Sequence, residues 1–187
     1  MKRIIIVHGW GGYPEEGWFP SFKNELETRG YQVLVPKMPH TENPTINDWV
    51  QFLSKTVGKP DENTYLVGHS IGCQTILRYL EGLNVGEKIG GALFVAGWFN
   101  LENMEDDEER TIAEPWLSTP INFERVRSAL PKSTLIISDN DPYGAFEENK
   151  KKFAELGSKI IVLHNADHLN GESHTSLPEA LTELESL

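Results

Sequence analysis

Cysteine is nearly absent from this chain, and long apolar runs are missing. The single cysteine, Cys73, excludes an intrachain disulfide, which is typical of proteins from a reducing compartment. No stretch approaches the roughly 20 apolar residues that a membrane-spanning helix needs. The apolar run near the start stops at His8, short of the roughly 7–15 residues of a signal-peptide core. We therefore expect a soluble, cytoplasmic protein that is not attached to a membrane.

Positive charge is also scarce. The 187 residues include 17 Lys and Arg against 28 Asp and Glu, which gives a formal net charge of −11. Such a surface repels a phosphate backbone, and no basic stripe offsets the repulsion. The H-E-x-x-H metal pattern and the glycine-rich nucleotide-binding patterns do not occur. The sequence therefore predicts no nucleic-acid binding, no metal and no other cofactor, and it leaves any protein partner unknown.

Short apolar runs alternate with amphipathic stretches along the whole chain, whose length indicates one domain over residues 1–187. The runs are apolar almost throughout, as strands of a parallel sheet covered on both faces must be. This alternation predicts an α/β fold with a three-layer, doubly wound sheet. The predicted strands are Arg3–Val7, Gln32–Val35, Thr64–Val67, Gly91–Val95, Thr134–Ile137 and Lys159–Leu163. The predicted helices are Phe19–Arg29, Ile46–Val57, Ile71–Glu81, Phe123–Ala129, Tyr143–Leu156 and Leu177–Glu185.

Two capping boxes and one unusual segment refine this pattern. Thr45 with Asp48 is expected to cap the second helix, and Ser176 with Glu179 the last one. Residues 98–121 instead carry a cluster of carboxylates among aromatic side chains. This segment is either a solvated acidic loop-helix or a short cap whose aromatics face a pocket.

The run Gly68-His69-Ser70-Ile71-Gly72 joins a predicted strand directly to a predicted helix. A nucleophile elbow has this order, because its serine must stand exposed on a strained turn while flanking glycines allow strand and helix to approach. The alternative is a glycine-lined turn with a serine at the helix N-cap. A serine hydroxyl also needs a base to take its proton, so the rest of the sequence must supply a base and a group that orients it.

Partners follow the two last strands in the chain order Ser, Asp, His that this arrangement uses. Asp139 and Asp141 follow the fifth strand, and we prefer Asp141 because Pro142 forces a turn above the sheet. His164 and His168 follow the sixth strand, and we prefer His168 because it lies deeper in its loop.

The loop after the first strand supplies the remaining candidates. Backbone N–H groups of Trp10 and Ile71 are expected to bind an oxyanion, with Gly9 or Gly11 as alternatives to Trp10. Cys73 is expected to pack in the core, as are Trp18 and Trp49. Substrate contacts are expected from His8, Gly9, Met38, His69, Trp98 and Phe99.

These residues resemble the small serine hydrolases of the retinoblastoma-binding serine hydrolase and YdeN type. The likeness extends to Trp18-Phe19-Pro20, Pro36-Lys37-Met38-Pro39 and Asp48-Trp49, and it covers nearly the whole chain. It implies a reduced α/β-hydrolase fold with a six-stranded, mostly parallel sheet, and a triad of Ser70, Asp141 and His168. That family commonly has glycine before the histidine, whereas Asp167 stands here.

The sequence thus predicts a serine hydrolase that cleaves small carboxylic esters or acyl groups through an acyl-enzyme. Its partner is expected to be a small-molecule acyl substrate. Two alternatives stay open: an amidase or peptidase with the same triad, and an idle hydrolase fold that binds a protein through the acidic segment.

Overall fold

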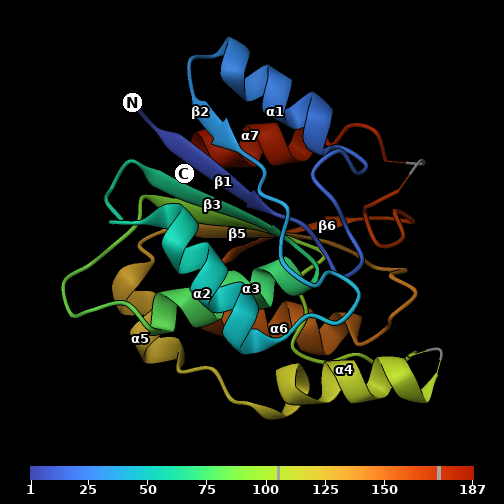
Figure 1. Cartoon of the computed structure of the whole chain (residues 1–187). Helices are drawn as coiled ribbons and strands as arrows, with labels where there is room; N and C mark the ends of the chain where they lie inside the picture. The colour runs from blue at the N-terminus through green and yellow to red at the C-terminus, as the bar shows by residue number, and fades with distance from the viewer. Residues whose placement is uncertain (105, 172–173) are drawn as a thin grey trace.

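The computed structural model describes residues 1–104, 106–171 and 174–187, and in this part of the chain the strands form one six-stranded sheet (Figure 1). Every neighbouring pair of strands is parallel. The strands are β1 (Arg3–Val7), β2 (Gln32–Leu34), β3 (Thr64–His69), β4 (Gly91–Val95), β5 (Ser133–Ser138) and β6 (Lys159–Leu163). The helices are α1 (Phe19–Thr28), α2 (Ile46–Val57), α3 (Ile71–Glu81), α4 (Asp107–Ser118), α5 (Phe123–Ala129), α6 (Phe146–Leu156) and α7 (Pro178–Ser186).

The strand order creates a topological switch point between β1 and β3. The order is β2-β1-β3-β4-β5-β6, so the chain leaves β1 toward one edge and then returns to pair β3 with its other side. In open α/β sheets, ligands bind outside the carboxyl ends of the strands at such a point. The loops that follow β1 and β3 therefore border the site. The loops that follow β5 and β6 reach it from their own side of the sheet.

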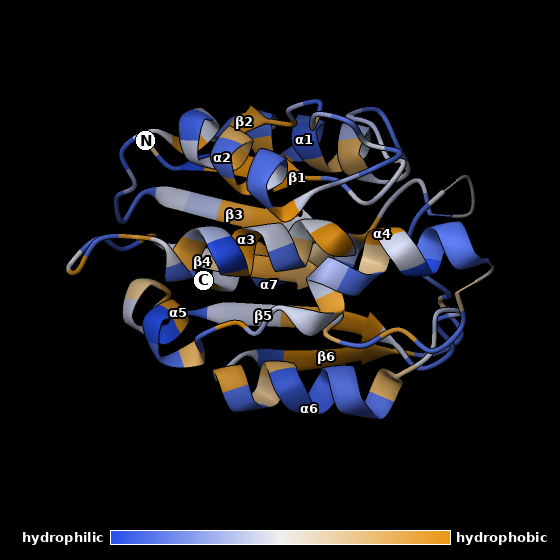
Figure 2. Ribbon diagram, turned by 60° about the horizontal axis from the view of Figure 1, so that its bottom comes forward, coloured by the Kyte–Doolittle hydropathy of each residue, from blue (hydrophilic) through white to orange (hydrophobic). Residues whose placement is uncertain are grey.

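Alternating strand residues divide the core into two layers. Ile4 and Ile6 pack with α1 and α7, whereas Ile5 and Val7 pack with α2 and α3 on the other face. Figure 2 shows the result, with strands largely orange and the outer helix α6 alternating between blue and orange. A strand buried on both faces has no polar side to keep, which explains the uninterrupted apolar runs.

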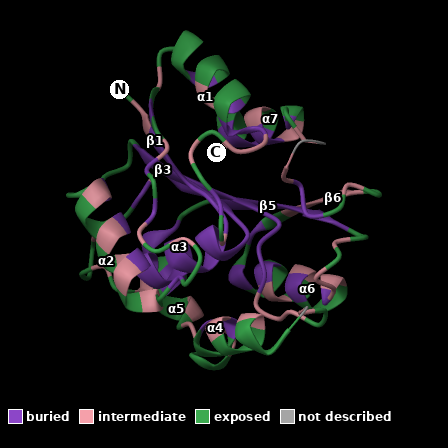
Figure 3. Ribbon diagram, turned by 45° about the vertical axis from the view of Figure 1, so that its right-hand side comes forward, coloured by how far each residue is buried: buried purple, intermediate pink, exposed green. Residues whose placement is uncertain are grey.

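Helix α3 lies at the centre of its layer and is buried along nearly its whole length (Figure 3). Its polar residues therefore need partners inside the protein. The guanidinium of Arg78 donates to the carbonyls of Trp116 and Thr119, at the carboxyl end of α4. This places a cation where the helix dipole is negative and fixes α4 across α3.

The expected α/β class and the six-stranded parallel sheet are confirmed. Thr45 caps α2 as predicted, since its Oγ1 accepts from the Asp48 N–H at 3.2 Å. The capping box at Ser176 is wrong: α7 begins at Pro178, and its N-cap residue Leu177 has no side-chain cap. Proline is preorganised for the first helical position, which moves the start past Ser176. Tyr143 likewise lies in a loop, because α6 begins only at Phe146.

Within the described residues, no helix is long and apolar enough to cross a membrane. The acidic segment contains α4, whose capping residue Asp106 accepts from the Glu109 N–H at 2.9 Å. Ala113 and Trp116 of α4 are buried, and the Trp116 indole donates to the Pro44 carbonyl at 3.0 Å. The segment is therefore packed onto the domain rather than detached from it, with residue 105 outside the described part.

Candidate active site

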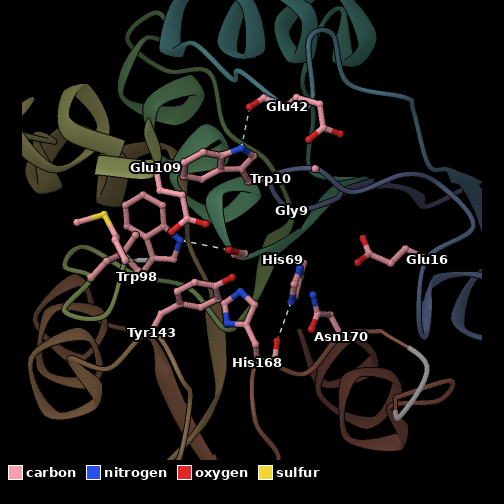
Figure 4. Close-up of a pocket in the computed structure, with 14 residues that line it drawn as sticks. Gly9, Trp10, Glu16, Glu42, His69, Trp98, Glu109, Tyr143, His168 and Asn170 are labelled. Atoms are coloured by element: carbon pink, nitrogen blue, oxygen red, sulfur yellow. Dashed lines mark hydrogen bonds between the residues drawn. The ribbon is translucent and has the colours of Figure 1, made fainter. Parts of the chain in front are cut away.

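A cavity of about 220 Å³ opens at the switch point of the sheet. It is smaller than the roughly 300–1,000 Å³ of sites for drug-sized ligands, which favours a small substrate. Figure 4 shows its aromatic and imidazole side chains gathered around one space, with Trp98, Tyr143 and His168 side by side. Its lining residues are Gly9, Trp10, Gly11, Glu16, Glu42, His69, Ser70, Trp98, Leu101, Met104, Glu109, Tyr143, His168 and Asn170.

Ser70 stands on the strained turn that the sequence predicts. Its backbone has φ 53° and ψ −124°, a conformation that costs a residue with a side chain of order 1–3 kcal/mol. The flanking glycines make the turn possible. A Cβ on Gly68 would lie 2.7 Å from the Cys73 nitrogen, and one on Gly72 would lie 2.3 Å from the Val7 carbonyl oxygen. Strand, turn and helix are thus packed backbone to backbone.

Gly72→Ala is expected to lower the free energy of unfolding by about 3 kcal/mol, at the upper end for overpacked sites. The reason is that the clashing atoms belong to the backbone of β1 and cannot rotate away. Urea unfolding measures the effect. Gly82→Ala is the matched control, because Gly82 ends the same helix at φ −81° and an added Cβ finds no contact under 3.4 Å. Equal destabilisation by both changes would contradict the close-approach explanation.

Two histidine–aspartate pairs follow β5 and β6, and they differ in burial. His168 Nδ1 lies 2.7 Å from Asp141 Oδ2, and both side chains are only 10% exposed. His164 Nδ1 lies 2.5 Å from Asp139 Oδ2, but the His164 side chain is 77% exposed and is not part of the cavity lining. The geometry therefore places His168, hydrogen-bonded to Asp141, in the cavity that Ser70 lines, and leaves the alternatives Asp139 and His164 paired outside it.

A second set of hydrogen bonds links the loop after β5, which carries Asp141 (the acid loop), to the loop after β6, which carries His168. Asn140 Oδ1 accepts from the Ser138 hydroxyl and from the Asp167 N–H, while Asn140 Nδ2 donates to Asp167 Oδ1 at 2.8 Å. Asp167 has φ 48°, in the left-handed region that favours glycine. The glycine that the family resemblance implies at this position would adopt this backbone without strain. Here the bonds to Asn140 hold the aspartate carboxylate, exposed, beside the acid loop.

The two expected oxyanion donors are available. Neither the Trp10 N–H nor the Ile71 N–H donates to an acceptor in the described part of the chain. Ile71 is the first residue of α3, where helix N–H groups have no intrahelical partner. Trp10 lines the cavity itself, and Ile71 directly follows the lining residue Ser70. The arrangement suits a developing negative charge, which backbone N–H groups stabilise.

The structure places His8 and Met38, two of the expected substrate-contact residues, outside the cavity lining. Both are fully buried next to it. His8 Nε2 accepts from the Met38 N–H at 3.0 Å, so its Nδ1 carries the proton and donates to the Gly9 carbonyl at 2.8 Å. His8 therefore positions the Gly9–Trp10 loop. Phe99 also lies elsewhere, between Phe123 and Phe153.

Gly9, His69 and Trp98, three further expected substrate-contact residues, do line the cavity. The Trp98 indole Nε1–H donates to Ser70 Oγ at 3.3 Å, which orients the hydroxyl. His69 is fully buried, and its Nε2 lies 2.9 Å from the His168 carbonyl oxygen, an acceptor. His69 must therefore donate through Nε2 and hold the backbone of His168 in place. Burial, and next the nearby His168, lower the pKa of His69 to about 3.

This buried imidazole makes stability depend on pH. The unfolded His69 binds a proton below its ordinary pKa of 6.5, whereas the folded one stays neutral down to about 3. The free energy of unfolding is therefore expected to fall as the pH falls from 6.5 toward 3, by up to about 1.4 kcal/mol per pH unit from this group. His69→Gln, whose amide can still donate to the carbonyl, should remove that contribution.

Urea unfolding at pH 6.5 and pH 5 measures the difference, which should be about 1.6 kcal/mol smaller in His69→Gln than in the wild type. His8 contributes in the same direction, because burial lowers its pKa too, but it is present in both proteins. Parallel pH dependences in the two proteins would show that His69 is not held neutral.

Several cavity residues escaped prediction because they come from loops remote in sequence. Glu16 precedes α1, Glu42 precedes α2, and Tyr143 precedes α6, where its ring lies 4.8 Å from the His168 ring. Tyr143 carried a signal as the second residue after Asp141. Leu101, Met104 and Glu109 carried one as members of the acidic segment 98–121, which does contribute to the cavity wall. Glu16, Glu42 and Asn170 carry no signal in the sequence.

Cys73 is buried, and its thiol donates to the Gly68 carbonyl oxygen. Burial raises the pKa of this thiol well above its ordinary value, so it packs rather than reacts. Among the described residues, no group of three or more His, Cys, Asp and Glu side chains is arranged to hold a metal ion. Trp18 and Trp49 are fully buried, as predicted.

Known proteins share both the sequence and the fold. The family model described as serine hydrolase matches residues 4–186. The YdeN protein of Bacillus subtilis (strain 168) is 30% identical over 179 residues, which cover 95% of this chain and 91% of YdeN. The serine hydrolase RBBP9 of Rattus norvegicus is 26% identical over 176 residues, 92% of this chain and 90% of RBBP9.

The crystal structure of the ydeN gene product from B. subtilis superposes with a TM-score of 0.90 at 28% identity, covering 100% of this chain and 98% of that one. Est1E from Butyrivibrio proteoclasticus, solved with ferulic acid bound, has a TM-score of 0.70 at 14% identity, covering 99% and 90%. The second likeness concerns the fold alone.

Proposed function

Because the chain belongs to the serine hydrolase family, we propose that it hydrolyses small carboxylic esters or acyl groups through an acyl-enzyme on Ser70. One observation carries the proposal: a buried His168–Asp141 hydrogen bond of 2.7 Å borders the cavity that Ser70 also lines. A base oriented by a carboxylate beside a serine on a strained turn is the arrangement that activates a hydroxyl.

In the proposed reaction, Ser70 Oγ attacks the carbonyl carbon and His168 accepts the hydroxyl proton. Asp141 keeps the proton on Nδ1, so that Nε2 is free to act as the base, and it stabilises the imidazolium. The Trp10 and Ile71 N–H groups stabilise the oxyanion. His168 then returns the proton to the leaving alcohol. Water, deprotonated by the same histidine, cleaves the acyl-enzyme and restores Ser70.

A fluorophosphonate probe tests this proposal at neutral pH, because its phosphorus accepts the activated serine oxygen and releases fluoride. Mass spectrometry of the labelled protein should find the adduct on the peptide that contains Ser70. Folded protein that takes no label would contradict the proposal. Matched ester and amide substrates of the same acyl group then separate an esterase from an amidase, and we expect the ester to be preferred.

A further inference from the structure

Every charged group in the cavity wall, apart from the candidate catalytic residues, is a carboxylate. The lining described above includes Glu16, Glu42 and Glu109, and it contains neither lysine nor arginine. The three carboxylates come from three separate segments, the loop before α1, the loop before α2 and the first turn of α4. They are therefore not one local acidic run that happens to border the site.

Figure 4 shows how these side chains are distributed around the space. Glu109 reaches in from the α4 side between Trp10 and Trp98, while Glu42 stands above Trp10 and Glu16 lies on the opposite side near Asn170. Glu42 also accepts the Trp10 indole N–H through its backbone oxygen, at 2.9 Å. Two of the carboxylates thus flank an indole that forms part of the wall.

Several neutral groups of the wall, away from the N–H donors next to Ser70, also favour a cation. Trp10, Trp98 and Tyr143 provide aromatic rings, whose faces attract cations. His69 is neutral and directs its Nε2–H at the His168 carbonyl, which leaves the lone pair of Nδ1 beside Gly9 and Ser70. Aromatic faces, a lone pair and carboxylates all disfavour an anionic ligand and favour a cationic one.

We propose that the substrate of this site is an ester whose acyl or alcohol part carries a protonated amine. The inference rests on the proposed hydrolase function and adds the charge class of its substrate. The ester carbonyl lies at Ser70, while the ammonium group lies toward the Glu109 and Glu42 side of the cavity, against the indoles. An ester carrying a free carboxylate or phosphate is disfavoured, because no cation in the described wall would compensate it.

Three esters of equal length and different charge test the proposal. Ethyl 6-aminohexanoate carries an ammonium group, ethyl heptanoate replaces it by methyl, and monoethyl pimelate replaces it by carboxylate. At pH 7 and low salt, kcat/KM is expected to be about tenfold higher for the amino ester than for ethyl heptanoate, and lowest for monoethyl pimelate. Added NaCl should shrink these differences by screening. Equal values, or a preference for the neutral ester, would overturn the proposal.

Single substitutions then locate the effect. Glu109→Gln and Glu42→Gln should each lower the ratio of kcat/KM for the amino ester to that for ethyl heptanoate by about five-fold, the upper range for a partly exposed pair. Glu62→Gln removes the same charge from the loop before β3, at the opposite end of the sheet, and should leave the ratio unchanged. A ratio that responds equally to all three variants would assign the preference to net charge and overturn the site.

The failure of this inference differs from the failure of the proposed function. If ethyl heptanoate is hydrolysed and the fluorophosphonate probe labels Ser70, the hydrolase proposal stands whatever the charge preference. If the probe does not label the protein and no ester is cleaved, both proposals fall. A labelled enzyme with no preference for the ammonium group overturns the charge class alone.

Discussion

Ser70→Ala is expected to abolish fluorophosphonate labelling and to lower kcat for ester hydrolysis by about 10⁴-fold or more, since the residual rate would come only from substrate binding and the oxyanion donors. The loss should be of this size because the variant lacks the oxygen that forms the acyl-enzyme. Probe labelling and initial rates on ethyl heptanoate measure it. The fold should be retained, because the Ser70 Oγ contacts the Trp98 indole at the cavity surface and its removal disturbs no core packing.

Ser54→Ala is the matched control, because Ser54 is an exposed residue on the outer helix α2. It should keep full labelling and activity. Circular dichroism and the midpoint of thermal unfolding establish that the Ser70 variant is folded. Labelling that persists in folded Ser70→Ala protein would place the nucleophile elsewhere and remove the basis of the proposed mechanism.

Asp141→Asn is expected to lower kcat by about 10⁴-fold while leaving the fold intact, the magnitude known for the wrong histidine tautomer. The expected fall in kcat follows from the two hydrogen bonds that Asp141 accepts. Asp141 Oδ1 accepts from the Tyr143 N–H at 3.0 Å, so an asparagine keeps its oxygen there. Its NH₂ group then faces His168 Nδ1 and donates to it, which moves the imidazole proton to Nε2 and blocks the base.

Asp139→Asn makes the same chemical change in the exposed pair with His164 and serves as the control. It should alter kcat less than two-fold, because neither Asp139 nor His164 lines the cavity and the His164 side chain is exposed. Rates of both variants on one ester decide the assignment. Loss of activity in Asp139→Asn with retention in Asp141→Asn would exchange the roles of the two aspartates.

The order of strands and helices was predictable because it depends on local patterns. Runs of Val, Ile and Leu fully buried on both faces look different from amphipathic helices, and α2, α3 and α5 begin and end where the periodicity indicates. The elbow at Ser70 was equally readable, since glycine at 68 and 72 is the only residue that lets the backbones of β1, β3 and α3 touch. The exception is the acidic segment, where composition alone could not separate a helix from a loop.

The choice between paired candidates required the tertiary structure. Asp139 and Asp141, like His164 and His168, are separated by a few residues in loops, and only the fold determines which pair is buried at the cavity and which is exposed. The charge of the cavity is likewise a tertiary property. Glu16 and Glu42 are single glutamates in loops, and Glu109 belongs to the acidic first turn of α4. None of these contexts tells whether the side chain faces solvent or a pocket.

The sequence by itself determined the α/β framework and the position of the nucleophile, because burial periodicity and glycine sterics act between residues close along the chain. Only the tertiary structure decided which histidine–aspartate pair has its histidine in the cavity that Ser70 lines, and that His8 lies beside that cavity and holds the Met38 backbone. Those outcomes depend on loops that meet only at the carboxyl ends of the parallel strands, where contacts are made between residues remote in sequence.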